Sequence, residues 1–157
     1  MKHSFYIIPF LIAALLCSCK TDNWIDWKAQ NEMFMIANGK RPDIITTATG
    51  LQYKVIADPN PSDAKPNSTS NVVCDYKLEL INGAVLDSTT NAYMSLSGVI
   101  PGFVEGIRKI HVQGDVVVYV PWKLGYGEKG TGTEGYENFV PPYSTLIYNI
   151  HLTALTN

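Results

Sequence analysis

The segment from Gly125 to Pro142 combines the residue types of a small-ligand site. It holds five glycines and three aromatic rings, and it closes on a Pro-Pro pair. Glycines on both sides of Tyr126 permit close approach between the backbone and a ligand. The phenol of Tyr126 offers a flat apolar wall and one hydrogen-bond donor. We therefore predict that Tyr126 binds a ligand, whereas Tyr136 either roofs the same site or joins Phe139 in sealing a long loop against a sheet.

Further rings and branched side chains fall on segments that border a predicted short helix. A pocket of rings with few polar groups is a usual form of small-ligand site. The same residues would also form a plain hydrophobic core, which is the simpler interpretation on composition alone. The residues concerned are Tyr76, Val99, Ile100, Phe103, Phe139 and Tyr148.

Other chemistries find little support in the sequence. His111 and His151 are far apart, and neither has a Cys, His or carboxylate at metal-ligand spacing, so we interpret both as surface histidines and predict no metal. Cys74 lies inside an apolar alternation, which suits a small core residue better than a nucleophile. No spacing unites Asp87 and Glu105 into an acid–base pair. The net charge of −2 argues against a nucleic-acid-binding face.

The elements that must position these residues follow from changes in hydrophobic period. From residue 50 onward the apolar residues recur with period two, which is typical of strands. Asn82-Gly83 predicts a hairpin turn, and Pro101 opens a short segment with helical spacing. The predicted strands cover residues 50–57, 72–81, 84–89, 114–121 and 144–155. This order predicts an α+β fold in which an antiparallel, curved sheet of about five strands wraps around one short helix.

A second helix is predicted ahead of the sheet, over residues 23–38. Gly39 and Pro42 end it. Its apolar residues cover two sides, and so broad an apolar surface must pack on something. One side holds Trp24, Trp27, Asn31 and Phe34, and the other holds Ile25, Ala29, Met33 and Ile36. The alternatives are packing on its own domain and packing on a second copy of the chain.

The first residues are typical of a bacterial lipoprotein signal. A positive start precedes an apolar run that is shorter than the roughly 20 residues needed to cross a bilayer. The run ends in Leu16-Cys17-Ser18-Cys19. A leucine, a small residue and then a cysteine resemble the lipobox, so Cys19 is the expected N-terminus of the mature chain and the residue that carries lipid. The alternative is an ordinary signal peptide with a leftover thiol.

Four stretches together resemble the FKBP-type peptidyl-prolyl isomerases. They are GAVLDST, VIPGFVEGIRKI, YVPWKLGYGEKG and FVPPYSTLIYNIHLTAL, which occur in the order and near the spacing of that family. TGLQYKVI also resembles the first strand of its bacterial secreted branch. The resemblance covers about residues 49–155 and implies a five-stranded antiparallel sheet wrapped around a short helix. It divides the chain into a signal peptide at 1–18, a lipid-anchored tether and helix at 19–48, and an FKBP-like isomerase domain at 49–157.

The pocket of this family carries over residue by residue. The resemblance implies catalytic roles for Tyr76, Asp87, Ile100 and Tyr126, in which the Ile100 main-chain N–H and the Tyr126 hydroxyl bind substrate carbonyls. The expected substrate-binding set, to which the loop ring Phe139 is added, is Leu86, Met94, Val99, Phe103, Phe139, Val140 and Tyr148. Leu86 stands where the family usually has Phe, Phe103 replaces the usual Trp, and Met94 stands where an aromatic residue is common. The loop after Tyr126 is also longer than in short bacterial members.

The resemblance implies a peptidyl-prolyl cis-trans isomerase that needs no cofactor and assists the folding of exported proteins. Because three walls are smaller than usual, a non-catalytic peptide-binding or chaperone module remains the alternative. The implied partners are proline-containing segments of exported proteins, macrolide-type FKBP ligands, and a membrane reached through lipid on Cys19. The implied location is the bacterial cell envelope, facing the periplasm or the cell surface.

Overall fold

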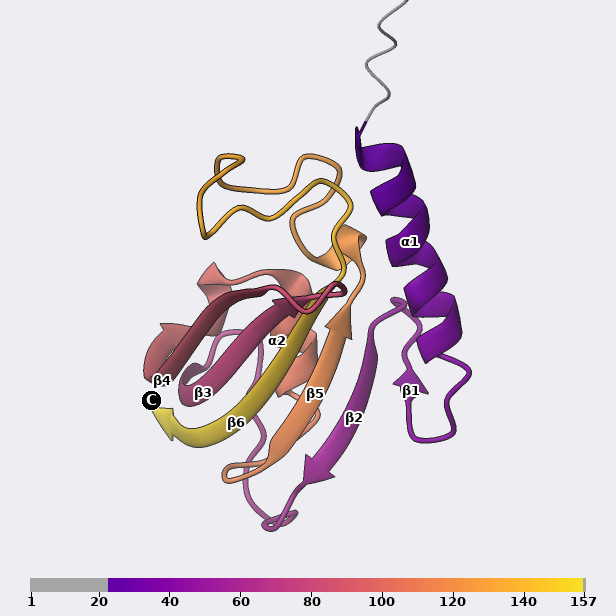
Figure 1. Ribbon diagram of the computed structural model, residues 1–157. Coiled ribbons are helices and arrows are strands. Elements are labelled where there is room, and N and C mark those ends of the chain that lie inside the picture. Colours follow the sequence, from indigo (N-terminus) through magenta and orange to yellow (C-terminus); the bar gives the residue numbers. More distant parts are fainter. Residues whose placement is uncertain (1–22, 157) are drawn as a thin grey trace, which may run out of the picture.

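The computed structural model of the protein describes residues 23–156. The predictions on the signal peptide, on Cys19 and on its lipid therefore lie outside the described residues. Within them the chain forms one six-stranded sheet with a helix on each face (Figure 1). None of the helices in this part of the chain has the length and apolarity needed to cross a membrane.

Every neighbouring pair of strands in the sheet is antiparallel, and the strand order is β1-β2-β5-β6-β3-β4. The strands are β1 (Ile45–Thr46), β2 (Gln52–Ala57), β3 (Asn71–Leu80), β4 (Val85–Ser95), β5 (Asp115–Val120) and β6 (Leu146–Thr156). The predicted fold class is confirmed. The count of about five strands omits β1, which is only two residues long and has no pattern of its own.

Alternate residues of β3 and β6 form the core, as the period of two predicts. On the inward face these strands bury Val72, Cys74, Leu78, Leu80, Leu146, Tyr148, Ile150 and Leu152. Strand β5 lies between β2 and β6, in agreement with its prediction as a central strand with apolar residues on both faces.

Strand β4 continues six residues beyond its predicted end at residue 89. Asn91 adopts a positive φ of 52°, and its N–H donates to the Asp75 carboxylate at 2.7 Å. The register between β3 and β4 shifts at this point, between Cys74 and Tyr76. The strand therefore passes through a bulge that interrupts the alternation on which the prediction relied.

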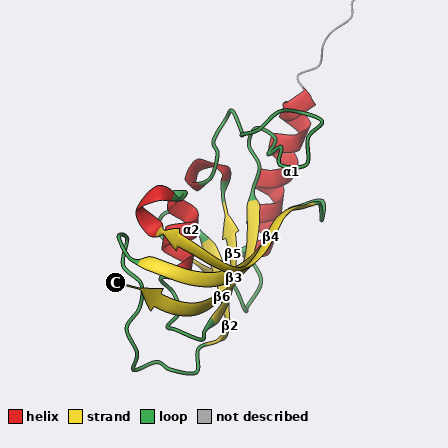
Figure 2. Cartoon of the chain, turned by 90° about the vertical axis from the view of Figure 1, so that its left-hand side faces the viewer, coloured by secondary structure: helices red, strands yellow, loops and turns green. Residues whose placement is uncertain are grey.

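Helix α2 (Pro101–Ile107) lies against the inner face of the sheet, as Figure 2 shows. Its contact with β5 is made through glycines, because a Cβ at Gly106 would lie 2.6 Å from Val118 and one at Gly102 would overlap Val120. These two positions explain why a helix of only seven residues contains two glycines. They let its backbone approach the strand and close the core.

Helix α1 (Asn23–Asn38) packs on the opposite face of the same strand, near the β1–β2 edge (Figure 1). Its Phe34 ring lies 6.0 Å from that of Tyr119, which alternates with Val118 and Val120 along β5. The Asn38 side chain donates to Gln52 at 2.8 Å, and Gln52 donates to the Met35 carbonyl. The side of the helix that holds Trp24, Trp27, Asn31 and Phe34 contacts its own domain, whereas Ile25, Met33 and Ile36 are exposed.

The structure corrects the interpretation of His111 as a surface residue, whereas His151 lies on the outer face of the sheet. Its side chain is buried, and its ring Nδ1 lies 2.8 Å from an Asp58 carboxylate oxygen. The Asp58 carboxylate also accepts the His111 backbone N–H at 2.9 Å. His151 is half-buried and pairs with Asp115 at 2.9 Å. Both histidines therefore join neighbouring segments of the fold.

Candidate functional site

A cavity of ≈ 270 Å³ lies between the inner face of the sheet and the start of α2. It is slightly smaller than the roughly 300–1,000 Å³ of pockets for drug-sized ligands, so it suits one small ring. Its lining residues are Tyr76, Leu78, Asp87, Met94, Gly98, Val99, Ile100, Phe103, Tyr126 and Tyr148. All four residues predicted as catalytic are among them, and so are four of the seven predicted to bind substrate.

Three rings that meet edge to face form the walls of the cavity. Phe103, from α2, lies 5.1 Å from Tyr148 of β6 and 6.1 Å from Tyr76 of β3, measured between ring centroids. The interplanar angles of these two pairs are 78° and 79°. Such pairs stabilise their arrangement by about 0.5–1.5 kcal/mol each beyond burial. The cavity therefore has stiff apolar walls contributed by three different elements.

The polar side chains of the cavity are few, and two of them are hydrogen-bonded to each other. The Tyr76 hydroxyl donates to the Asp87 carboxylate at 2.5 Å. Burial, and next this hydrogen bond, raise the pKa of Tyr76 above its ordinary value. Burial also raises the pKa of Tyr148. Both phenols therefore stay protonated at neutral pH, and they remain neutral walls rather than charged ones.

Several hydrogen-bond donors of the lining residues have no partner within residues 23–156, and two of them are the donors predicted to bind substrate carbonyls. Within residues 23–156, neither the Ile100 N–H nor the Tyr126 hydroxyl takes part in a hydrogen bond. Ile100 directly precedes Pro101, and its carbonyl accepts the N–H groups of Phe103 and Val104. This first turn fixes the backbone at Ile100. A bound peptide would find two preformed donors beside an apolar hollow, which is an arrangement suited to holding carbonyl groups.

A second hollow of ≈ 280 Å³ adjoins the cavity and shares three of its residues, Leu78, Asp87 and Tyr126. Its other lining residues are Leu86, Thr131, Gly132, Asn138 and Val140. Two residues predicted to bind substrate, Leu86 and Val140, therefore lie in this adjoining hollow rather than in the ring-lined cavity.

Phe139 departs from its predicted place. It lines neither hollow, and its ring lies 5.9 Å from that of Trp24 on α1. Tyr136 is 70% exposed, so it neither roofs the cavity nor seals the loop. The glycines instead bring the two legs of the loop together, because Gly130 has a φ of 65° and any Cβ there would overlap the Val140 carbonyl. The adjacent Thr131 exchanges two backbone hydrogen bonds with Val140.

Sequence reasoning missed two lining residues, Leu78 and Gly98. Leu78 belongs to the inward-facing alternation of β3, so its pattern places it next to Tyr76 on the same face. Gly98 contributes only backbone at the end of the short helix Leu96–Gly98. No side-chain pattern could have indicated it.

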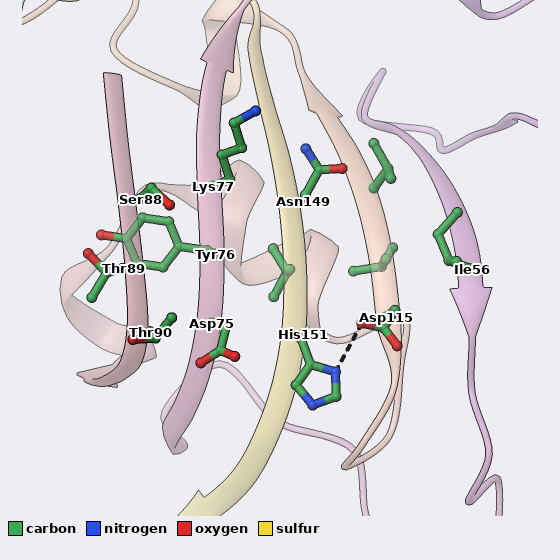
Figure 3. A pocket seen from close by; sticks show the side chains of 13 residues that line it. Ile56, Asp75, Tyr76, Lys77, Ser88, Thr89, Thr90, Asp115, Asn149 and His151 are labelled. Carbon is green, nitrogen blue, oxygen red and sulfur yellow. Dashed lines mark hydrogen bonds and ion pairs between the residues drawn. The ribbon is translucent and has the colours of Figure 1, made fainter. Parts of the chain in front are cut away.

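A wider hollow of ≈ 420 Å³ lies on the outer face of the sheet, and Figure 3 shows its polar side chains. His151 pairs with Asp115, as the dashed line marks, and Asp75 accepts the Asn91 N–H. These groups are engaged with one another across neighbouring strands. Most lining residues of this hollow are polar, and it lacks the cluster of rings that walls the other cavity.

Two family models match the chain, and one of them covers the whole cavity. The model of the FKBP-type peptidyl-prolyl cis-trans isomerase matches residues 62–153, which include every residue that lines the cavity. The chain belongs to this family. The model of the domain amino-terminal to FKBP-type peptidyl-prolyl isomerase matches residues 20–55 of the FKBP chain, which include α1 and most of β2.

Bacterial envelope and isomerase proteins are among the relatives of this FKBP chain. The outer membrane protein MIP of Legionella longbeachae is 36% identical over 82% of the chain and 54% of its own length. The FKBP-type 22 kDa peptidyl-prolyl cis-trans isomerase of Escherichia coli is 32% identical over 81% of the chain and 60% of its own length. The chain spans about half the length of the curated relatives it matches.

Solved structures share the fold. The crystal structure of FkpA from Escherichia coli superimposes with a TM-score of 0.76 at 29% identity and covers 83% of this chain and 60% of its own. A peptidyl-prolyl cis-trans isomerase from Pseudomonas syringae superimposes with a TM-score of 0.75 over 85% of this chain and 96% of its own. At 20% identity the second match supports the fold alone.

Proposed function

We propose that this chain is a peptidyl-prolyl cis-trans isomerase that rotates X-Pro bonds in exported proteins and so assists their folding. One observation carries the proposal: a cavity walled by Tyr76, Phe103 and Tyr148 is also lined by Ile100 and Tyr126, whose donors have no partner among residues 23–156. The family to which the chain belongs supports it.

The proposed mechanism needs neither an acid–base group nor a cofactor. Rotation about an amide meets a barrier of about 18–20 kcal/mol, because the nitrogen shares its lone pair with the carbonyl. In the twisted state that sharing is lost and the carbonyl is less polar. An apolar cavity that excludes water therefore disfavours the planar amide relative to the twisted one. The Ile100 N–H and the Tyr126 hydroxyl would add differential binding by holding the carbonyls in their turned positions.

Asp87 has a supporting part in this proposal. Its carboxylate accepts a hydrogen bond from the Tyr76 hydroxyl. This bond fixes the orientation of the Tyr76 ring, which is one wall of the cavity. The residues of the adjoining hollow, Leu86 and Val140 among them, would contact the side chain next to the proline. Macrolide-type FKBP ligands would occupy the same ring-lined cavity.

A protease-coupled assay on X-Pro peptides tests the activity. We expect the protein to accelerate isomerisation above background at micromolar concentration, and Asp87→Ala to lower the rate. Asp115→Ala is the matched control, because Asp115 lies on the outer face of the sheet and pairs with His151. Peptide binding without acceleration would overturn the isomerase and leave the non-catalytic peptide-binding or chaperone module, which the small walls at Leu86, Met94 and Phe103 favour.

We further propose that residues 1–18 are a signal peptide, that Cys19 carries lipid, and that residues 49–157 form the isomerase domain in the bacterial cell envelope. The lipobox-like sequence ending at Cys19 supports this, and so does the relative named an outer membrane protein. Labelled palmitate should enter the wild-type chain and the control Cys74→Ser, but not Cys19→Ser. Equal labelling of Cys19→Ser would refute the anchor.

A further inference from the structure

Helix α1 is hydrogen-bonded to residues 144 and 145, which directly follow the loop that carries Tyr126 and Val140. The Trp27 indole N–H donates to the Ser144 hydroxyl at 3.0 Å, and the Thr145 backbone N–H donates to the Asn31 side-chain oxygen at 2.6 Å. Asn31 and Thr145 are fully buried. Lys28 places its ammonium group 4.6 Å from the centre of the Tyr143 ring. The helix thus holds residues 143–145 by three different contacts.

These contacts continue toward the site through hydrogen bonds. The Ser144 hydroxyl donates to the Pro141 carbonyl at 2.8 Å, directly after Val140 of the adjoining hollow. The Tyr143 N–H donates to the Gly127 carbonyl at 3.0 Å, directly after Tyr126 of the cavity. Both legs of the loop that carries Tyr126 and Val140 are therefore tied to the one segment that α1 holds.

The backbone of residues 143–145 is strained at Tyr143, and the contacts with α1 stabilise this conformation. Tyr143 has a φ of 60°, an uncommon conformation for a non-glycine residue that persists where the surroundings over-determine it. Its ring meets that of Trp122 edge to face at 5.3 Å, and Lys28 covers it. Buried polar bonds also fix position more sharply than apolar packing alone, since each partner is costly to leave unpaired.

We propose that Trp27 and Asn31 of α1 are positioning residues for the isomerase site, acting through Ser144 and Thr145 on the placement of Tyr126 and Val140. This inference rests on the proposed function. The amino-terminal helix is then a working part of the catalytic domain. Through these contacts the helix determines how well Tyr126 and Val140 fit a twisted peptide.

A double-mutant cycle on kcat/KM for X-Pro peptides tests the route. Trp27→Phe keeps a ring but removes the donor, and Ser144→Ala removes the hydroxyl that receives it. We expect each variant to lower kcat/KM by about three- to tenfold at temperatures well below unfolding. The double variant should have the same kcat/KM as Ser144→Ala alone, because both changes interrupt the same chain of hydrogen bonds. Losses that multiply, or unchanged kcat/KM in both single variants, would overturn the proposal.

Met33→Ala is the matched control, because Met33 is 69% exposed on the other side of the same helix. It should leave kcat/KM unchanged, and an equal loss in Met33→Ala would overturn the proposal. Should Trp27→Phe fail to fold, Ser144→Ala alone carries the test of this route, and unchanged kcat/KM in Ser144→Ala would overturn the proposal.

Hydrogen exchange separates failure of this inference from failure of the proposed function. We expect Trp27→Phe to speed amide exchange in residues 125–145 and to leave β3 and β6 protected as in the wild type. If the wild-type chain shows no isomerase activity, the proposed function fails, and this exchange pattern still decides whether α1 holds the loop. Unchanged exchange in residues 125–145 would overturn the inference.

Discussion

Tyr126 brings to the cavity a hydroxyl that no other described residue engages. Tyr126→Phe should therefore leave the fold intact and remove one bond to the substrate. A lost hydrogen bond of about 1–3 kcal/mol lowers kcat/KM roughly ten- to a hundredfold. The protease-coupled assay measures it, with Tyr136→Phe on the exposed tip of the same loop as control. Equal rates for Tyr126→Phe and the wild type would remove Tyr126 from the site.

Cys74 should be inert as a thiol. It is fully buried on β3, and burial raises its pKa to about 11. The thiolate is the reactive form, so in a Cys17→Ser/Cys19→Ser background we expect no reaction with a thiol reagent at about pH 8 until denaturant is added. Rapid labelling of the native protein would show that the core opens around this strand.

At the residue scale, the alternation of apolar residues and the family resemblance predicted the residues of the cavity. They did not predict contacts between residues far apart in the sequence. Tyr76 and Tyr148 follow from the alternation of their strands, and the structure brings them together. His111 was misjudged because its partner Asp58 lies 53 positions away, where no spacing rule applies. Phe139 was misplaced for the same reason, since its ring packs on Trp24 of a separate element.

The contact between α2 and β5 sets a strict limit on side-chain size. Gly106→Ala would place a methyl group 2.6 Å from Val118, which is itself fully buried and cannot move aside. Overpacking of this kind costs about 1–3 kcal/mol, so we expect a lower free energy of unfolding in urea. Gly98→Ala is the control, because a Cβ there meets no atom within 4 Å. Equal stability of Gly106→Ala and the wild type would contradict this packing.

The loop after β2 is tied to the turn before β5 by an acid-sensitive bond. The His111 backbone N–H, more than any other group, lowers the pKa of Asp58 below its ordinary value. The folded state therefore favours the charged carboxylate, and the resulting stability is complete above the ordinary pKa and lost as the pH falls through the lower, folded value.

Asp58→Asn tests this pH dependence by urea unfolding across a pH series. The stability advantage of the wild type over Asp58→Asn should be present above the ordinary pKa of an aspartate. It should shrink as the pH falls below about 4, where the carboxylate begins to take up its proton. A difference that stays constant down to strongly acidic pH would show that the charge of Asp58 has no part in it.

At the element scale, boundaries with clear signals were predicted well. The helix over residues 23–38 agrees with α1 because Gly39 and Pro42 mark its end. Strand β4 was cut short because the bulge at Asn91 breaks the alternation. Strand β1 escaped notice because two residues are too few to show a period.

The molecule as a whole should unfold in one step, with α1 included. All three tryptophans lie at the contact between α1 and the sheet or loop, since Trp24 meets Phe139, Trp27 bonds Ser144, and Lys28 of α1 approaches Trp122. Tryptophan fluorescence therefore reports on this contact, and far-UV circular dichroism reports on the sheet. We expect coincident urea transitions. An earlier fluorescence transition would show that α1 detaches before the sheet unfolds.

At this scale the sequence predicted the architecture but left the docking of α1 open. The helix has two apolar sides, and no local sequence signal shows which of them packs on the sheet. The choice depends on Asn31 and Trp27, whose partners lie 114 and 117 positions away. Such pairings become visible only when the sheet has brought the two ends of the chain together.

Strand β6 follows β5 along the sequence, yet it lies between β5 and β3 in the middle of the sheet. Without β6, strands β3 and β5 would each lack their partner on one side, and their unpaired edges would be open to association with other chains. A truncation that removes β6 should therefore be degraded rather than tolerated.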